Sequence, residues 1–393
     1  MQYRKFRADH IFTGKEILSS DNVLVTDATG LVVGIMGIAD AGDGIEVFEG
    51  MLSPGFINCH CHLELSHLKG YIPERTGLVD FILKVVNERH FEEGIILQAI
   101  ENAENEMWQN GIVAVGDICN NTLTIPQKLK RRLRYHNFIE ASGFPPSVAG
   151  IRFQRSLDFY NAYKENFPNT TIVPHAPYSV SPEMFQLINE FPDNQLLTIH
   201  NQETAAEDEL FKTGQGDFLS LYEKMGIDIS FFKPSKKSSL QTFLPYLNKN
   251  QSIILVHNLT TSADDIEFKK LLTTNYKLQT FFCLCPNANL YITNALPDVE
   301  MLMKHNADIV LGTDSLASNH QLSIWEEIKT LQKNFPALEL ATLLQWATIN
   351  GASALQMDNE LGSFEKGKRP GVVLIEGLDG MNNLQDSISK RLL

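Results

Sequence analysis

Residues 55–62 read GFINCHCH, and this stretch decides the fold. It is an uncharged, mostly apolar run that ends in two histidines separated by one residue. Side chains alternate along a strand, so His60 and His62 point to one side and Cys61 to the other. The stretch therefore predicts a buried strand that presents two imidazoles together at its carboxyl end.

Seven further apolar runs follow, separated by segments of helical character. They are 112–119 (IVAVGDIC), 136–141 (HNFIEA), 171–175 (TIVPH), 196–200 (LLTIH), 252–257 (SIILVH), 278–285 (LQTFFCLC) and 308–314 (DIVLGTD). Runs this apolar, alternating with helices, indicate a parallel sheet covered on both faces. Eight in succession predict an α/β fold, a (β/α)8 TIM barrel, rather than an open sheet.

The two ends of the chain have a different character. Residues 1–52 hold short strand-like runs separated by glycines, and the segment LGSFEKGKRPGVVLIEG near the carboxyl end also reads as turn and strand. We expect 1–52 and 356–393 to form one small β-sandwich domain, and 53–355 to form the barrel. Long helical segments at 77–109 and 204–250 follow the first and fifth strands, where insertions shape or cover a substrate site.

Composition narrows the possible partners and compartment. The formal charge of −14 disfavours nucleic acid and acidic membranes. The charged amino-terminal segment lacks the apolar run of a signal peptide, and no stretch reaches the length of a membrane span. Five cysteines, four of them spaced C-x-C, suit a reducing cytoplasm better than a disulfide framework.

Polar residues gather at the predicted strand ends. Besides His60 and His62, the fourth, fifth, sixth and eighth runs end in His175, His200, His257 and Asp314. Barrel active sites are assembled at this face. Two imidazoles on one strand, a third from another strand and the carboxylate of Asp314 suit zinc or ferrous iron.

Each residue also has an ordinary structural explanation. A lone histidine at a strand end is usually a hydrogen-bonded structural residue, and an aspartate there commonly caps the next helix. Glu203 follows His200 by three residues and either transfers a proton at the metal or begins a helix, where its charge is favourable. The C-x-C cysteines are better read as packed thiols than as zinc ligands. The convergence of five strand ends favours a metal site.

The chain resembles the amidohydrolase superfamily, specifically its cytosine-deaminase-like branch with chlorohydrolases and purine-type deaminases. The resemblance runs along nearly the whole chain. Its motifs are PGFINCHCHLELS, PHAPYSVS, IHNQETAAEDELF, ILVHNLT, CPNANLYI, LGTDSLASN and the closing LGSFEKGKRPGVVLI. The HLELS run is similar to that of the aminodeoxyfutalosine deaminase group.

The resemblance implies roles for matching positions. The implied metal ligands are His60, His62, His200 and Asp314. Glu203 matches the proton shuttle, and His257 matches the histidine that polarises the substrate or the attacking water, which Asp314 would also orient. No lysine ends the fourth run, which favours one metal ion, zinc before iron, over a lysine-bridged pair. Departures lie at Cys59, Cys61 and Gly371, away from this chemistry.

The expected reaction is hydrolytic deamination of an aminated, purine-like heterocycle by metal-bound hydroxide, with aminodeoxyfutalosine the leading named candidate. Substrate-contact candidates are Glu64, His175 and Tyr178. A chlorohydrolase or a cyclic amide hydrolase would use the same site, and an inactive binding barrel is the non-enzyme alternative. The expected partner is a small molecule, with neither nucleic acid nor membrane, and the sequence leaves a homodimer open.

Overall fold

The computed structural model describes residues 3–247, 250–273, 278–381 and 383–393. Within these ranges, eight parallel strands form the centre of the molecule in two runs of four, ordered β11-β10-β9-β8 and β12-β13-β14-β15. The strands are β8 (Phe56–Cys61), β9 (Ile112–Cys119), β10 (Arg134–Ala141), β11 (Thr170–Pro174), β12 (Leu196–Asn201), β13 (Ser252–His257), β14 (Gln279–Leu284) and β15 (Asp308–Leu311).

Backbone hydrogen bonds join the two runs into a closed barrel. The His200 N–H donates to the His175 carbonyl (3.0 Å), and the Asp314 N–H donates to the His60 carbonyl (3.1 Å). The second junction needs Gly312, because a Cβ there would lie 2.9 Å from His60 Cβ and from Cys283 Sγ. The backbone contact that closes the barrel therefore also brings Asp314 next to His60.

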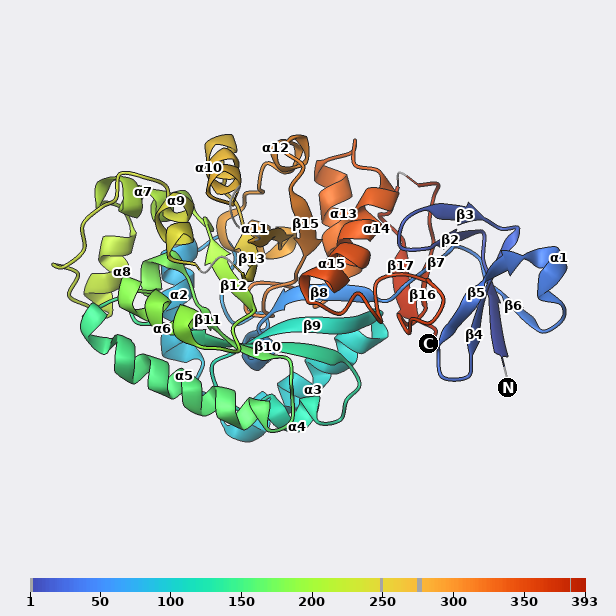
Figure 1. Ribbon diagram of the computed structural model, residues 1–393, viewed down its shortest axis with the longest axis horizontal. Coiled ribbons are helices and arrows are strands. Elements are labelled where there is room, and N and C mark those ends of the chain that lie inside the picture. Colours follow the sequence, from blue (N-terminus) through green and yellow to red (C-terminus); the bar gives the residue numbers. More distant parts are fainter. Residues whose placement is uncertain (1–2, 248–249, 274–277, 382) are drawn as a thin grey trace.

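Helices follow the strands and cover the outside of the barrel (Figure 1). On the β8–β11 half they are η1 (Leu63–Leu68), α2 (Leu78–Glu88), α3 (Glu93–Gln109), α4 (Ile125–Lys128), η2 (Pro146–Val148), α5 (Ala149–Lys164), η3 (Pro177–Ser179) and α6 (Pro182–Glu190). On the other half they are α7 (Ala205–Thr213), α8 (Phe218–Lys224), α9 (Ser239–Phe243), η4 (Leu244–Tyr246), α10 (Ala263–Thr273), α11 (Pro286–Thr293), α12 (Val299–Lys304), α13 (Ile324–Asn334), α14 (Leu340–Ala347) and α15 (Ile349–Ala354). No helix in the described part of the chain is long and apolar enough to cross a membrane.

Two small sheets stand at one end of the molecule, where both chain ends meet (Figure 1). They have the orders β5-β4-β1-β6 and β17-β16-β7-β2-β3. Their strands are β1 (Tyr3–Arg7), β2 (His10–Phe12), β3 (Ile17–Ser19), β4 (Asn22–Asp27), β5 (Val32–Gly37), β6 (Ile45–Val47), β7 (Met51–Ser53), β16 (Val373–Glu376) and β17 (Ile388–Arg391), with the short helix α1 (Ile38–Ala41). Phe6, Leu24, Leu52 and Leu374 share one buried cluster between the sheets. We propose that 1–52 and 356–393 form a small domain beside a 53–355 barrel.

The barrel strands agree with the sequence-based prediction to within three residues at each end. The largest difference is at the eighth strand, which ends at Leu311, so that Asp314 lies in the following loop with φ +57°. The small strands β1, β2 and β3 were not predicted individually. Two have only three residues each, and Tyr3–Arg7 (YRKFR) has two adjacent charged residues that break the alternation expected of a strand.

A buried ion pair fixes the first turn beyond β8. Lys128 Nζ lies 2.5 Å from Asp117 Oδ2, and both side chains are completely buried. The other Asp117 oxygen accepts a hydrogen bond from the Leu63 N–H (2.9 Å), directly after His62. Lys128 also donates to Asn137 Oδ1 on β10 (2.7 Å). The pair therefore ties β9 and β10 to the segment that carries the two-histidine motif.

Replacing Lys128 with methionine should destabilise the protein strongly, because it leaves the Asp117 carboxylate buried without a cation. Losing one partner of a buried pair costs about 3–5 kcal/mol. The measurement is the free energy of unfolding in urea. The control, Lys130→Met, breaks the exposed contact with Glu101 (2.7 Å) and should leave the free energy of unfolding nearly unchanged. Equal losses in the two variants would show that the buried pair does not hold this region.

Candidate functional site

Imidazole and carboxylate groups converge at the carboxyl end of the barrel. His62 Nε2 lies 3.1 Å from His60 Nε2, 3.2 Å from His200 Nε2 and 3.4 Å from Asp314 Oδ1. Ligand atoms arranged tetrahedrally about 2.0–2.1 Å from zinc lie roughly 3.3–3.4 Å apart. The four side chains that the sequence nominated therefore have the spacing of ligands around one small cation.

His257 adds a further nitrogen to this centre. Donor atoms of His60, His200, His257 and Asp314 all lie within 4.8 Å of one another. His257 Nε2 is buried and has no hydrogen-bond partner among the described residues, whereas Nδ1 faces Asn289 Oδ1 at 3.0 Å. A buried ring nitrogen without a partner is costly unless a ligand or water occupies the space that it faces.

The lowered pKa values of the histidines favour binding of a cation. Burial lowers the pKa of His62 to about 3. Burial, together with the neighbouring His60 and His175, also lowers the pKa of His200 well below its usual value. Neutral imidazoles present the lone pairs that metal coordination requires. The donor set of nitrogen and carboxylate oxygen therefore fits a divalent metal ion such as zinc or iron.

Asp314 is held as an anion. Burial alone would raise its pKa, but the contact with His60 and the nearby rings of His62 and His257 outweigh burial, and the pKa is lowered. Ser318 Oγ donates to Asp314 Oδ2 (2.5 Å), which leaves Oδ1 toward His60 and His62 (3.5 and 3.4 Å). Asp314 therefore directs Oδ1 toward the histidines, while Ser318 holds Oδ2 in place.

Glu203 lies beside His257, on the segment that follows β12. Its Oε1 is 3.5 Å from His257 Nε2, and burial raises the pKa of the carboxyl to about 7. Both oxygens of Glu207 accept backbone hydrogen bonds, from the N–H of Gln202 (3.0 Å) and of Glu203 (3.2 Å). Glu207 therefore positions the Glu203 backbone, while the Glu203 side chain itself faces His257.

The proposed substrate-contact residues lie on the rim, in different settings. The Tyr178 ring packs on Phe218 of α8 (4.3 Å between centroids), so it belongs to the hydrophobic cluster beneath the inserted helices. His175 is half-buried, and its Nδ1 lies 2.7 Å from Ser179 Oγ. Glu64 is buried, with Oε2 accepting the Asn120 N–H (2.9 Å), and burial raises its pKa to about 7.

Four residues around the same centre have a left-handed backbone conformation. Gln202, His257, Asn258 and Asp314 all have φ between +48° and +74°, a region that residues other than glycine rarely adopt. Each follows or ends a barrel strand. Such strained residues cluster where a site must fix side-chain direction.

The cysteines take no part in the centre. All five are free and buried. Burial raises the pKa of Cys119 to about 12 and the pKa of Cys59, Cys61 and Cys285 well above the usual value. Protonated thiols are poor metal ligands. These positions act as small core residues, as the sequence suggested.

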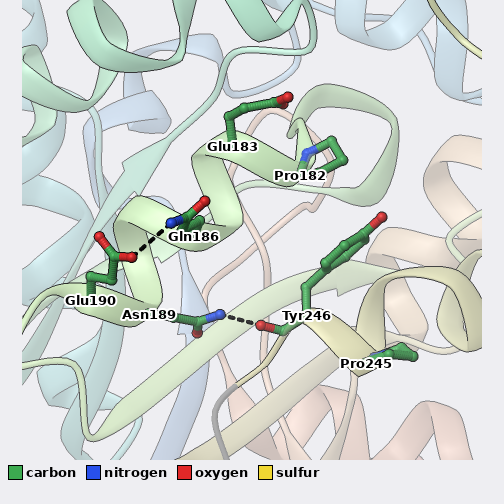
Figure 2. A pocket seen from close by; sticks show the side chains of 7 residues that line it. All are labelled: Pro182, Glu183, Gln186, Asn189, Glu190, Pro245 and Tyr246. Carbon is green, nitrogen blue, oxygen red and sulfur yellow. Dashed lines mark hydrogen bonds between the residues drawn. The ribbon is translucent and has the colours of Figure 1, made fainter.

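A separate hollow of about 500 Å³ lies on the flank of the barrel, between α6 and η4 (Figure 2). Its lining residues are Pro182, Glu183, Gln186, Asn189, Glu190, Pro245 and Tyr246. None of them belongs to the centre described above. Asn189 donates to the Tyr246 carbonyl across the hollow, so the two elements are already joined there.

Sequence reasoning missed several residues that hold the site together. Asn289 in CPNANLYI orients His257, and Ser318 in LGTDSLASN orients Asp314. Both residues lie inside motifs that the sequence analysis quotes, so their position in these motifs could have identified them as site residues. Glu140 lies on β10 and Asn120 directly follows β9, both outside these motifs, and Asn120 Nδ2 donates to Glu140 Oε2 (2.6 Å).

The chain is similar to known proteins over most of its length. The chain is 28% identical over 329 residues to the adenosine deaminase of Helicobacter pylori, covering 81% of this chain and 77% of that protein. The crystal structure of H. pylori aminofutalosine deaminase with methylthio-coformycin superposes with a TM-score of 0.80 at 22% identity, over 96% and 93% of the two chains. An adenosine deaminase from Xanthomonas campestris with bound zinc gives a TM-score of 0.72 at 21% identity, over 97% and 86%.

These two structures show that the fold is shared. The family is shown by a match between the sequence and a family model. The family model described as Amidohydrolase family matches residues 51–390, which include the whole barrel and every residue of the centre described above. The chain belongs to the Amidohydrolase family.

Proposed function

We propose that this protein is a metal-dependent hydrolase that deaminates an aminated heterocycle. One observation carries the proposal: a buried carboxyl, Glu203, faces His257 (3.5 Å) beside a cation-sized set of three imidazoles and one carboxylate. Such a set can activate water, and the carboxyl can carry the proton that hydrolysis must move. The adenosine deaminase relative of H. pylori supports deamination over other hydrolytic reactions.

The proposed metal ligands are His60, His62, His200 and Asp314, holding one ion, with zinc preferred and iron the alternative. When bound, the cation supplies Lewis acidity that lets water attack near neutral pH. Zinc is supported by the donor chemistry and by the X. campestris neighbour with bound zinc. A lysine-bridged metal pair is disfavoured, because Pro174 and His175 stand where β11 ends.

In the proposed deamination, Asp314, His257 and Glu203 have separate roles. Asp314 and His257 orient the attacking water, whose oxygen bonds to the ring carbon that carries the amino group. Glu203 accepts a proton from this water and delivers it to a ring nitrogen. As the carbon–nitrogen bond breaks, Glu203 passes the second proton, from the hydroxyl added to the ring carbon, to the leaving amine, so that ammonia departs and a ring carbonyl remains.

The other reactions named from the sequence would use the same groups. Displacing chloride or opening a cyclic amide also needs activated water and an acid, so the centre alone does not separate them from deamination. The deaminase relatives favour deamination. They also favour a purine-like substrate such as aminodeoxyfutalosine. A catalytically inactive binding barrel is disfavoured, because every proposed ligand and the proton carrier are present.

Two further parts of the proposal concern the setting of the enzyme. We place it in the cytoplasm, which the five free, buried cysteines support. A homodimer remains a prediction from the sequence.

Metal analysis tests the ligand set. We expect about one equivalent of zinc or iron per chain in purified protein, because the donor atoms surround space for one ion. His200→Ala should lose most of this metal and the activity together. The control is His136→Ala, since that buried histidine lies toward the other end of β10 and pairs with Thr171. Two equivalents that both depend on His60, or full retention after replacing His60 and His200, would contradict the assignment.

Glu203→Gln separates proton transfer from metal binding. The amide nearly matches the carboxyl in shape, so the fold and bound metal should be retained. It cannot accept and redeliver a proton, so kcat should fall by about 10²–10⁴-fold or more. Glu207→Gln is the matched comparison and should show a smaller loss, because its carboxyl contacts backbone rather than His257. Near-normal turnover by Glu203→Gln would assign the proton to another group.

A substrate panel tests the reaction class. Metal-replete enzyme should release ammonia from at least one aminopurine, aminopurine nucleoside or aminopyrimidine, with the release detected by a coupled dehydrogenase assay. Chlorotriazines and cyclic amides serve as the comparison substrates. Hydrolysis of a cyclic amide with no ammonia from the aminated compounds would rule out deamination as the reaction.

A further inference from the structure

Gln202 forms the turn between a proposed metal ligand and the proposed proton carrier. It directly follows β12, is completely buried and has φ +48°. Side chains alternate along a strand, so a continued extended backbone would point Glu203 to the side opposite His200. Instead, Glu203 Oε1 lies 3.5 Å from His257 Nε2, and donor atoms of His257 and His200 lie within 4.8 Å of each other. The left-handed backbone at Gln202 therefore brings the side chains on both sides of it to one centre.

The side chain of Gln202 is a buried amide that is bound at both ends. Its Nε2 donates to Asp208 Oδ1 (3.3 Å) and to Asp265 Oδ2 (3.1 Å). Its Oε1 accepts from Thr261 Oγ1 (2.7 Å). Ionised carboxylates only accept hydrogen bonds, so the amide can meet both of them only with its NH2 end. These contacts therefore fix the orientation of the amide as well as its position.

Asp265 is an anchored anion. It accepts from the backbone N–H and the hydroxyl of Ser262 (3.0 and 2.7 Å) and from Ser238 Oγ (2.5 Å). Burial alone would raise its pKa, but the hydrogen bonds, led by those of Ser238 and Gln202, outweigh burial and the pKa is lowered. The Gln202 amide therefore has a charged partner that other residues hold in place.

The two carboxylates lie on helices outside the barrel sheet. Asp208 is in α7, where it pairs with Lys212 (2.9 Å) and accepts the N–H of Ser239 at the start of α9 (2.9 Å). Asp265 is in α10. α9 packs against both α7 and α10 (Figure 1). The inserted helices are thus connected to the turn that follows β12.

The left-handed conformation of Gln202 needs such support. It costs free energy in residues other than glycine and persists where the surroundings hold it. The backbone is held from both sides, since the N–H donates to Glu207 Oε1 (3.0 Å) and the carbonyl accepts from the Thr260 N–H (3.1 Å). Glycine would adopt the same backbone angle freely but would offer no amide to the two carboxylates. The side chain therefore adds a restraint that the backbone alone does not provide.

We propose that Gln202 is a positioning residue, whose buried amide fixes the turn that directs the Glu203 carboxyl toward His257. The inserted helices α7 and α9, which supply its anchors, thereby orient the proton carrier in addition to any part in covering a substrate. This inference rests on the proposed proton transfer by Glu203. Gln202 acts through Glu203 and takes no part in the chemistry itself.

The test replaces Gln202 with glycine, which removes the amide but still adopts the left-handed backbone. The fold and the bound metal should be retained. On an ammonia-releasing substrate of the panel, kcat should fall by up to about 10²-fold, because a misplaced catalytic group can cost that factor. KM should change much less, since Glu203 acts in the chemical step. Gln202→Asn keeps a shorter amide and tolerates the same backbone, so it should recover part of the loss.

Gln356→Gly is the matched control. Gln356 is also left-handed, with φ +59°, but it is exposed. It lies beside Arg134 and Asn169, at the amino-terminal ends of β10 and β11 and thus at the other end of the barrel. The same replacement there should keep the wild-type kcat. An equal fall of kcat in the two variants would overturn the inference.

A double-mutant cycle distinguishes positioning from a general structural role. If Gln202 acts through Glu203, Gln202→Gly should change the residual kcat of Glu203→Gln by no more than about twofold. Effects of the two substitutions that simply multiply would overturn the inference. Loss of the metal from Gln202→Gly would also overturn it, by assigning the residue to the metal centre. If Gln202→Gly does not fold, Gln202→Asn takes its place in the cycle.

A crystal structure of Gln202→Gly decides the inference if the proposed function fails, either because the panel yields no substrate or because Glu203→Gln turns over normally. The Glu203 carboxyl should then have moved away from His257, while His200 at the end of β12 keeps its place. A Glu203 carboxyl that keeps its 3.5 Å contact with His257 would overturn the inference.

Discussion

The arrangement of this molecule depends on one constraint: imidazole nitrogens and a carboxylate oxygen are enclosed 3.1–3.5 Å apart, the spacing of ligands around one small cation. Lone pairs this close repel unless a proton or a metal ion lies among them. The parallel barrel meets this constraint because all its strands end at one rim. Gly312 lets the last strand reach the first, which brings Asp314 to the β8 histidines.

Around this centre, a second set of buried polar groups fixes the orientation of the histidine and carboxylate side chains. Asn289 holds His257, Ser318 holds Asp314, and Glu207 holds the backbone of Glu203. Farther out, the Glu327 oxygens accept from the Asn287 N–H (2.9 Å) and from Asn319 Nδ2 (2.8 Å), joining the loops after β14 and β15. Such supporting contacts matter because site geometry must hold to fractions of an ångström.

Much of this could be predicted from the sequence. Apolar runs between helical segments predicted the barrel strands, and polar residues at their ends predicted the centre, because both signals are local. Glu140 and Asn120 could not be found in this way. Each is an ordinary polar residue near the end of a strand, and only the strand order brings them together with Glu64. The small strands β2 and β3 were also missed, since three residues carry no usable periodicity.

The buried carboxyls of the rim differ in what surrounds them, and this difference separates their roles. Glu203 faces a ring nitrogen of His257 close to the cation-sized centre, where a proton can be passed on. Glu140 instead faces the amide of Asn120 with one oxygen, and its other oxygen has no hydrogen-bond partner among the described residues. That second oxygen lies 3.7 Å from Nδ1 of His200. Glu203 is thus placed to exchange a proton beside His257, whereas Glu140 is held by an amide group that only donates to it.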